Sequence, residues 1–250
     1  MSSTPAERYA VVSCHVERPL DDAVWARFSA LQERRPCGFA VAALLRPPDG
    51  AAREDETVWL ERAREAAARA PLGHHTHWTA PDHARPTGGD TGDRVRREAA
   101  WMRERGLAPT LFCGGGWYAD ADVAEACAEL GYADCTPRAT RPPYLPTGEP
   151  WAFLPAPARV RLPSGAGLLA IPTTHSLGDL GRALLRRRTL PGIVHVYLHD
   201  MDLVDRRRRA LLGAVLRVLM RVAEPSDLDA LRARVAPAAP EIAWADVARF

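Results

Sequence analysis

Histidines are concentrated in one stretch of this chain, and their spacing suits metal binding. The segment of residues 72–79, LGHHTHWT, holds three of the eight histidines in the sequence. In an extended strand, side chains two residues apart share a face, so His75 and His77 point one way while His74 and Trp78 point the other. Neutral imidazole is a common ligand of zinc and related ions. The histidine pair, His75 and His77, therefore predicts two metal ligands. A solvated polar loop is the alternative, because local spacing fixes no third ligand.

Other side chains able to do chemistry come where predicted strands end. The apolar run of residues 8–16 becomes polar at its end, where His15 and Glu17 share one face. The apolar run of residues 192–199 is the clearest strand pattern in the chain, and it ends in His199. Because the carboxyl ends of parallel strands meet at one edge of a sheet, we expect these three side chains to lie beside the histidine pair.

Strand and helix patterns alternate about seven times, and this order predicts the fold. Strands are expected over residues 8–16, 38–45, 72–79, 109–113, 132–136, 171–175 and 192–199, and helices over 20–34, 54–70, 94–106, 120–130 and 204–222. Residues 79–93 read as a long loop, and residues 137–170 as an irregular excursion with a hairpin around Ser164 and Gly165. We expect an α/β fold whose parallel sheet is closed or nearly closed into a barrel. His175 also ends one of these strands, and it is expected at the same site.

Composition indicates one domain over residues 1–250, with a C-terminal helical extension over residues 224–250. The chain is 47% hydrophobic, which is enough for a substantial core. It has no apolar run long enough to span a membrane, and its first residues lack the apolar core of a signal peptide. We therefore expect a soluble cytoplasmic protein without a membrane partner. The five cysteines form no C-x-x-C pair and are expected to be reduced.

The basic residues limit the chemistry that is available. All 33 of them are arginine, which excludes Schiff-base catalysis and a P-loop lysine. The net charge of +2 gives no general attraction to nucleic acid, and the arginine runs at 186–188 and 206–209 flank helices, so no nucleic-acid partner is expected. Arg138 and Arg141 are predicted to be solvated loop residues. The alternative is that they recognise an anionic substituent.

The motifs described above resemble those of the NodB-type polysaccharide deacetylases, over about residues 8–222. Residues 73–79, GHHTHWT, are similar to the family's metal-binding motif, and residues 198–200 match its final L-H-D motif. Residues 112–118, FCGGGWY, are similar to its third motif. The resemblance implies an irregular (β/α)7 TIM-like barrel that binds a divalent metal, with zinc as the first choice. It also implies hydrolysis of an amide on a sugar.

The chain departs from this family pattern at three places. Where the family has adjacent aspartates after the first strand, a base and a metal ligand, this chain has Cys14-His15-Val16-Glu17. Cys113 replaces the arginine of the third motif. The second motif has two histidine ligands. If His75 is the first of them, the position of the second is Thr79. If His77 is the second, the position of the first is Gly73. We therefore expect a rearranged metal set of His75, His77 and His15, and the alternative set adds Glu17 to these three.

The resemblance implies a metal-assisted hydrolase that removes an N-acetyl group from an amino sugar or a sugar-containing metabolite. Glu17 or His15 would accept the proton of the attacking water, and His199 would protonate the departing amine. Asp200 would fix the tautomer of His199, while His195, deeper on the same strand, is structural. The residues expected to stack on the substrate, a small molecule or an oligosaccharide, are Trp78, Trp117 and Tyr118.

The altered first motif leaves a second function open. In that alternative the chain keeps the fold, holds no metal, and either binds carbohydrate or performs acid/base chemistry with His15, Glu17 and His199. The two hypotheses differ in whether the histidine pair binds a metal.

Overall fold

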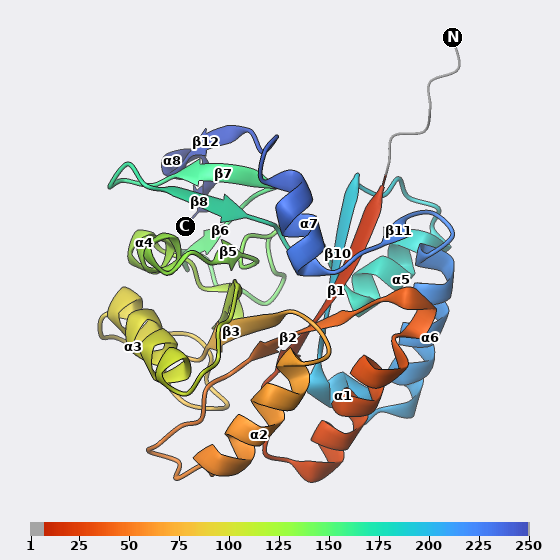
Figure 1. Ribbon diagram of the computed structural model, residues 1–250. Coiled ribbons are helices and arrows are strands. Elements are labelled where there is room, and N and C mark those ends of the chain that lie inside the picture. The colour runs from red at the N-terminus through yellow and green to blue at the C-terminus, as the bar shows by residue number, and fades with distance from the viewer. Residues whose placement is uncertain (1–7, 250) are drawn as a thin grey trace.

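The computed structural model describes residues 8–249, which form one large sheet with helices packed against it (Figure 1). The sheet has the strand order β12-β7-β8-β5-β4-β3-β2-β1-β10-β9, and β11 pairs with β1 outside this path. All pairs in it are parallel except β7 with β8. The strands are β1 (Tyr9–Val16), β2 (Val41–Leu45), β3 (Leu72–Thr76), β4 (Leu111–Gly114), β5 (Ala133–Asp134), β7 (Ala158–Arg161), β8 (Gly167–Ala170), β9 (His175–Ser176), β10 (Ile193–His199), β11 (Glu224–Pro225) and β12 (Glu241–Ala243). Two further strands, β6 (Trp151–Ala152) and β13 (Ala248–Arg249), pair with each other.

The helices begin at polar residues that cap them. The α-helices are α1 (Asp22–Arg34), α2 (Glu56–Ala67), α3 (Thr91–Glu104), α4 (Ala121–Leu130), α5 (Leu177–Leu185), α6 (Arg206–Leu219), α7 (Leu228–Val235) and α8 (Trp244–Val247). Short 3-10 turns are η1 (Pro36–Gly38), η2 (Gly115–Trp117) and η3 (Asp200–Leu203). An aspartate or serine side chain accepts a backbone N–H of the first turn in each of α1 to α7. These caps satisfy donors that the helix itself cannot satisfy, so they fix where each helix starts.

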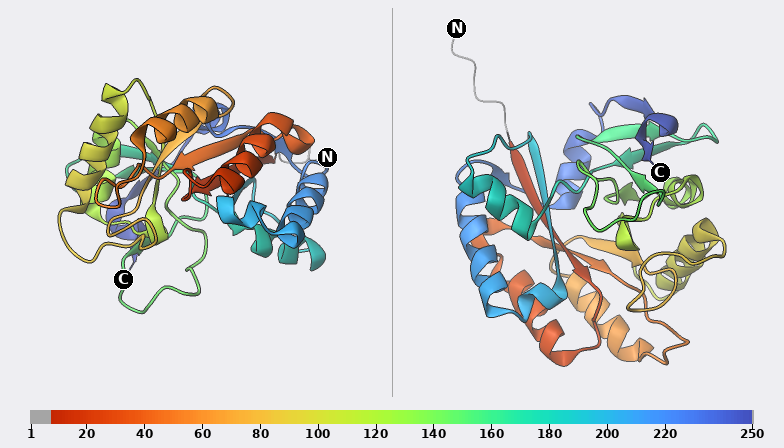
Figure 2. Two further views of the ribbon diagram at one scale, coloured as in Figure 1. Left: turned by 90° about the horizontal axis from the view of Figure 1, so that it is seen from below. Right: turned by 180° about the vertical axis from the view of Figure 1, so that it is seen from behind.

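Alternation along the central strands separates an outer apolar face from an inner face that becomes polar. Val12 and Cys14 of β1 point outward into the core formed with α1, α2, α5 and α6. The inward side chains of the same strand change from Val11 to Ser13 to His15 toward its carboxyl end. Helix α7 lies at the opposite end, where Leu228 and Leu231 pack into the inner core. In Figure 1, β1 and β10 run downward from the end where α7 lies. The polar inner side chains therefore gather at the lower end, which faces the viewer in the left view of Figure 2.

The expected mixed α/β fold with a mostly parallel sheet is confirmed, but no barrel closes within residues 8–249. The strand path ends at β9 on one side and β12 on the other. Residues 171–174 only approach closure: Thr173 N donates to Pro137 O on the β5 side, and Thr174 N donates to His195 O of β10. Pro137 and Pro172 interrupt a continuous ladder here, because proline has no N–H to donate. The TIM-like closure inferred from the resemblance is therefore replaced by a strongly curved open sheet.

The segment after residue 223 contains more than helices. It includes α7 and α8, and also β11 and β12, which join the main sheet, and β13, which pairs with β6. The hairpin expected around Ser164 and Gly165 is present as β7 and β8. No helix among residues 8–249 is long and apolar enough to cross a membrane.

A buried carboxyl in β5 makes the stability of the fold depend on pH. Asp134 is 4% exposed and accepts a hydrogen bond from Thr136 N, and burial raises its pKa from 3.8 to about 6. The folded state thus holds a proton that the unfolded state releases between pH 4 and 6, so stability falls as the pH rises through 6. Relative to Asp134→Asn, which keeps the acceptor, the wild type should lose about 3 kcal/mol of unfolding free energy between pH 4 and pH 8. Denaturant unfolding of both proteins across this range measures the difference. A pH-independent difference would contradict the prediction.

Candidate active site

The residues predicted from strand ends meet on the inner face, at the carboxyl end of the sheet. They are His15 and Glu17 at the end of β1, His75 and His77 at the end of β3, and His199 at the end of β10. The register puts His15 directly opposite His199 and puts His75 opposite Cys113 of β4. His74 points outward, as its position in the strand predicts, and binds Glu98 of α3 at 2.8 Å. The parity of β3 therefore aims both members of the histidine pair at the same place.

Backbone carbonyls set the tautomers of the histidine pair. His75 Nδ1 lies 2.7 Å from Cys113 O, and His77 Nδ1 lies 2.8 Å from Pro81 O. A carbonyl oxygen only accepts, so each Nδ1 carries a hydrogen, and in the neutral rings each Nε2 presents a lone pair. The two Nε2 atoms are 3.2 Å apart. Two lone pairs at this distance repel unless a cation lies between or beside them.

Glu17 completes a three-ligand group. Its Oε1 lies 3.8 Å from His75 Nε2 and 3.6 Å from His77 Nε2. Tetrahedral zinc with bonds of 2.0–2.2 Å has ligand atoms separated by about 3.3 Å. The three observed separations are close to this value. Two histidines and one glutamate match the donor set of many catalytic zinc sites, which keep their fourth position for water or substrate.

The charge balance of this group calls for a cation. Burial opposes ionisation of Glu17, but contacts with His75 and His77 hold its pKa far below its ordinary range, so Glu17 is a carboxylate. Burial also lowers the pKa of His75, which keeps that ring neutral. Two protonated rings 3.2 Å apart would repel strongly, and a divalent ion supplies positive charge without this cost.

His15 lies one layer deeper than the group of Glu17, His75 and His77. Its Nε2 is 3.6 Å from Cys113 Sγ, and its ring centre is 4.5 Å from that of His75. Burial, together with the neighbouring His75 and His199, holds the pKa of His15 well below its ordinary range. Burial likewise raises the pKa of the Cys113 thiol. At neutral pH this layer is therefore a neutral imidazole and a protonated thiol.

His199 is the histidine of the cluster that reaches solvent. Its side chain is 38% exposed, and its Nε2 lies 3.5 Å from Glu17 Oε1. It lines a hollow of about 400 Å³ together with Tyr197, Arg182 and Asp202. The Asp202 carboxylate accepts from His199 N and so fixes the backbone at the strand end. His199 is thus placed to exchange protons between the cluster and a molecule in the hollow.

Asp200 has a different role from the one that the sequence predicts. Its carboxylate accepts hydrogen bonds from Arg18 N at 2.8 Å and from Met201 N at 2.8 Å, and neither bond involves the ring of His199. Burial raises the pKa of Asp200 to about 6. Because Arg18 directly follows Glu17, this bond positions the Glu17 carboxylate. Asp200 is therefore a positioning residue for the loop after β1.

The three aromatic residues predicted to bind substrate divide into two groups. Trp117 packs with its ring centre 5.2 Å from that of His15. Trp78 and Tyr118 instead meet edge to face at 5.1 Å. Trp78 belongs to the core formed with α3 and α4, and Tyr118 packs against that core. His75 and His77 lie on one face of the extended segment, and Trp78 lies on the other. The same alternation that brings the histidine pair together therefore points Trp78 away from the cluster. Only Trp117 is placed beside the histidines, and it is buried.

Two residues of the site were not predicted from the sequence. Tyr197 lies between His195 and His199 on β10, and its ring stacks 5.2 Å from that of His15. Strand parity alone could have identified it. Arg138 was expected in solvent, but it is 4% exposed and lies over the rings of Trp117 and Tyr197. No spacing signal marks it, because it follows β5 through Pro137 in an irregular segment.

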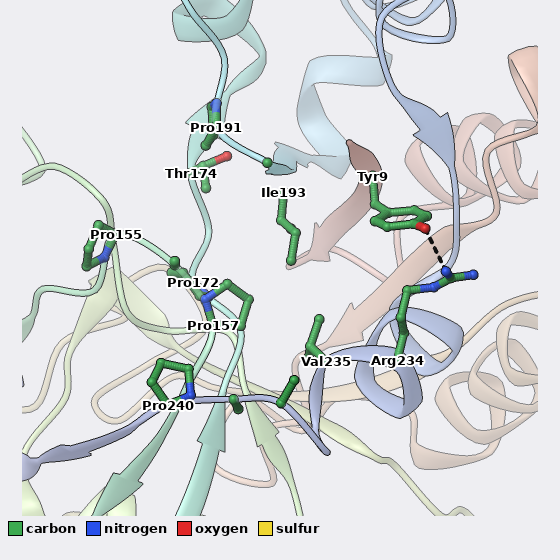
Figure 3. Close-up of a pocket in the computed structure, with 14 residues that line it drawn as sticks. Tyr9, Pro155, Pro157, Pro172, Thr174, Pro191, Ile193, Arg234, Val235 and Pro240 are labelled. Atoms are coloured by element: carbon green, nitrogen blue, oxygen red, sulfur yellow. Dashed lines mark hydrogen bonds between the residues drawn. The ribbon is translucent and has the colours of Figure 1, made fainter. Parts of the chain in front are cut away.

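The remaining histidines lie outside the cluster. His175 lines a separate hollow with Asp179 and Arg186, and it belongs to none of the possible metal-binding groups within residues 8–249. His195 is fully buried and pairs with Ser13 Oγ at 2.9 Å, in agreement with a structural role. A cavity of about 380 Å³ lies at the opposite end of the strands (Figure 3). Its lining is mostly proline and aliphatic, with Tyr9 bonded to Arg234, and none of the clustered histidines reaches it.

Comparison with known proteins shows similarity at the level of fold. No protein-family model and no curated protein matches the sequence. The 4-alpha-glucanotransferase of Thermococcus litoralis superposes with a TM-score of 0.53 at 11% identity, over 91% of this chain. This chain spans only 38% of that enzyme, and identity this low shows a shared fold alone. A Bordetella bronchiseptica protein, assigned provisionally as a polysaccharide deacetylase involved in O-antigen biosynthesis, aligns over 92% of this chain and 90% of its own at 17% identity. Its TM-score of 0.43 is too low to support an argument.

The geometry predicts that one divalent ion binds to each chain through the histidine pair. Untagged protein loaded with zinc and dialysed should retain one ion per chain by mass spectrometry of the metal. His75→Ala and His77→Ala should each weaken zinc binding by more than the roughly 10- to 100-fold that loss of an outer-shell partner costs. His83→Ala is the matched control, because His83 lies exposed on the loop after the pair. Equal zinc retention by all four proteins would contradict this assignment.

Proposed function

We propose that this protein is a metal-dependent amide hydrolase that removes an acyl group, most simply N-acetyl, from an amino sugar or a sugar-containing metabolite. One observation carries the proposal: two imidazoles with fixed Nδ1–H tautomers aim their Nε2 atoms, 3.2 Å apart, at the same place as the Glu17 carboxylate. The sugar is suggested by the motif resemblance of residues 73–79 and 198–200.

The residues present fit a zinc ion, and the proposal assigns each of them a part. Glu17, His75 and His77 would hold the ion. When bound, such an ion polarises a carbonyl and lowers the pKa of water toward neutrality. His15 was also expected as a ligand. It belongs to a neighbouring group of possible ligands with His75 and Cys113, and in this proposal it would stay a neutral ring that packs against His75. Glu17 was expected as a base or as a further ligand. The distances of 3.8 and 3.6 Å from its Oε1 to the two Nε2 atoms favour a ligand.

His199 moves the proton in this scheme. Water adds its oxygen to the acyl carbon, the carbon–nitrogen bond breaks, and the departing amine takes a proton to leave as a neutral amine or an ammonium ion. His199 is the cluster residue with access to the hollow, so it can take up the water's proton and deliver it to that nitrogen. Asp200 keeps Glu17 in place through the Arg18 amide, and Asp202 keeps the backbone of His199 in place.

A metal-free function has one observation in its favour. His199 Nε2 lies 3.5 Å from Glu17 Oε1, and both residues lie at the end of the strand pair that also carries His15. These three residues would suffice for sugar binding or for acid/base chemistry. In that case, however, the lone pairs of the histidine pair would face each other with no cation to join them.

Acetate release separates the two functions. Zinc-loaded protein should release acetate from N-acetylglucosamine or its oligomers, a chelator should abolish the release, and added zinc should restore it. His199→Ala should lower kcat by roughly 100- to 10,000-fold, because it removes the proton carrier while zinc content stays at one per chain. His83→Ala, a histidine exposed on the loop after the pair, serves as the control and should be unaffected. Sugar binding without metal, together with acetate release that does not respond to the chelator, would favour the metal-free alternative.

A further inference from the structure

Arg138 is a buried cation with empty hydrogen-bond donors. It is 4% exposed, and its Nε and Nη1 atoms have no hydrogen-bond partner among residues 8–249. None of the ion pairs in this part of the chain includes Arg138. A guanidinium loses much solvation on burial and normally regains it through a carboxylate or several acceptors. The guanidinium does contact the hydroxyl of Tyr197, so it is Nε and Nη1 that lack an acceptor among residues 8–249.

Two aromatic rings hold the guanidinium next to the histidine cluster. Its central carbon lies 4.4 Å from the ring centre of Trp117 and 5.0 Å from that of Tyr197. Stacking on ring faces returns part of the lost solvation and leaves the N–H edge free for an acceptor in the plane of the group. Both rings also lie 5.2 Å from the ring of His15. A group bound at Arg138 would thus be separated from the histidine cluster by the rings of Trp117 and Tyr197.

The placement of Trp117 has a conformational cost of its own. Its φ angle is +59°, in the left-handed region that bulky side chains rarely adopt, and it follows Gly116, whose φ is also +59°. Such strain persists only where surrounding contacts impose it, and it commonly marks a site of function. Here the contacts that hold the indole are those with Arg138, Tyr197 and His15. The strained backbone of Trp117 therefore places its indole against the guanidinium of Arg138.

The hollow beside His199 is also basic. It adjoins a second hollow of about 290 Å³, and Arg182 lines both of them. Together the two hollows are lined by four arginines and two aspartates: Arg182, Arg186, Arg188, Arg208, Asp179 and Asp202. The excess of positive charge would attract an anion into these two hollows.

We propose that Arg138 receives an anionic group of the substrate, a carboxylate or a phosphate carried by the acylated amino sugar. A planar guanidinium with free edge donors can bind either group through two parallel hydrogen bonds. The inference rests on the proposed function for the identity of the sugar. Its test measures binding, so it does not depend on whether the bound sugar is hydrolysed.

The test compares three ligands that differ in charge. Full-length zinc-loaded protein is titrated calorimetrically with N-acetylglucosamine, with the corresponding uronic acid, and with N-acetylglucosamine 6-phosphate. At least one anionic sugar should bind roughly 10- to 100-fold more tightly than the neutral one, the range expected for a hydrogen bond to a charged group. The tighter of the two anions identifies the group. Equal binding of all three ligands, or binding of none, would overturn the inference.

Substitution shows whether Arg138 is the receptor. Arg138→Gln should abolish the preference for the anionic sugar, whereas Arg141→Gln, an exposed residue of the same segment, should keep it. If folded Arg138→Gln still prefers the anionic sugar, the preference comes from the arginines that line the two hollows, and the inference is overturned. If circular dichroism shows that Arg138→Gln does not fold, Arg138→Lys replaces it; this variant keeps the charge but loses the planar fork, so the preference should shrink. A preference as large as in the wild type would overturn the inference.

These outcomes are distinct from failure of the proposed function. Absence of acetate release alongside an Arg138-dependent preference for anions would reject hydrolysis and keep the anion site. Acetate release from neutral and anionic sugars at equal kcat/KM, with no effect of Arg138→Gln, would keep hydrolysis and reject the anion site.

Discussion

Two backbone carbonyls determine what the histidine cluster can bind. Cys113 O and Pro81 O each accept the Nδ1–H of one ring, and this leaves both Nε2 atoms as acceptors directed at each other. Without these bonds either ring could turn its N–H toward its neighbour and form an ordinary hydrogen bond. With them, the pair and the Glu17 carboxylate all present electron pairs to one point. A water molecule has only two hydrogens for these three acceptors, whereas a metal ion can bind all three.

The sheet explains why these groups meet. Alternate residues along β1, β3 and β10 point inward. The parallel register places His15 level with His199, and it places Val16, and hence Glu17 beyond it, level with His74 and His75. On the outer face, alternate residues of β1 and β10 are apolar and pack on α1, α2, α5 and α6, whereas β3 places His74 there, against Glu98 of α3. Since a slip of one residue would exchange the two faces, burial of the outer residues also fixes the inward direction of His15 and His199. The packing of the core therefore maintains the geometry of the site.

The sequence predicts this part of the structure well because it depends on local periodicity. The parity of residues 72–79 was enough to bring His75 and His77 together and to send His74 to the other face. The same reasoning failed where long-range packing decides. Asp200 lies next to His199 in the sequence, yet its carboxylate binds the Arg18 amide, a contact between β1 and β10 that no spacing reveals. Arg138 follows a proline in an irregular segment, so periodicity says nothing about its direction. Whether the barrel closes depends on single hydrogen bonds around Pro137 and Pro172. The number of alternating strands and helices in the sequence does not predict these bonds.

The distribution of unfavourable features along the strands gives an independent indication of where ligands bind. At the end near α7 the inner side chains are aliphatic, and the cavity there is lined mainly by proline and apolar residues. At the other end are three costly features: facing lone pairs in the histidine pair, a left-handed Trp117, and a buried Arg138 with empty donors. Each of them lowers the stability of the chain by itself, and each would be relieved by an added group, a cation for the first and an anion for the third. Because Trp117 and Tyr197 contact both His15 and Arg138, a ligand of the histidine pair and a ligand of Arg138 would bind at the same end of the sheet.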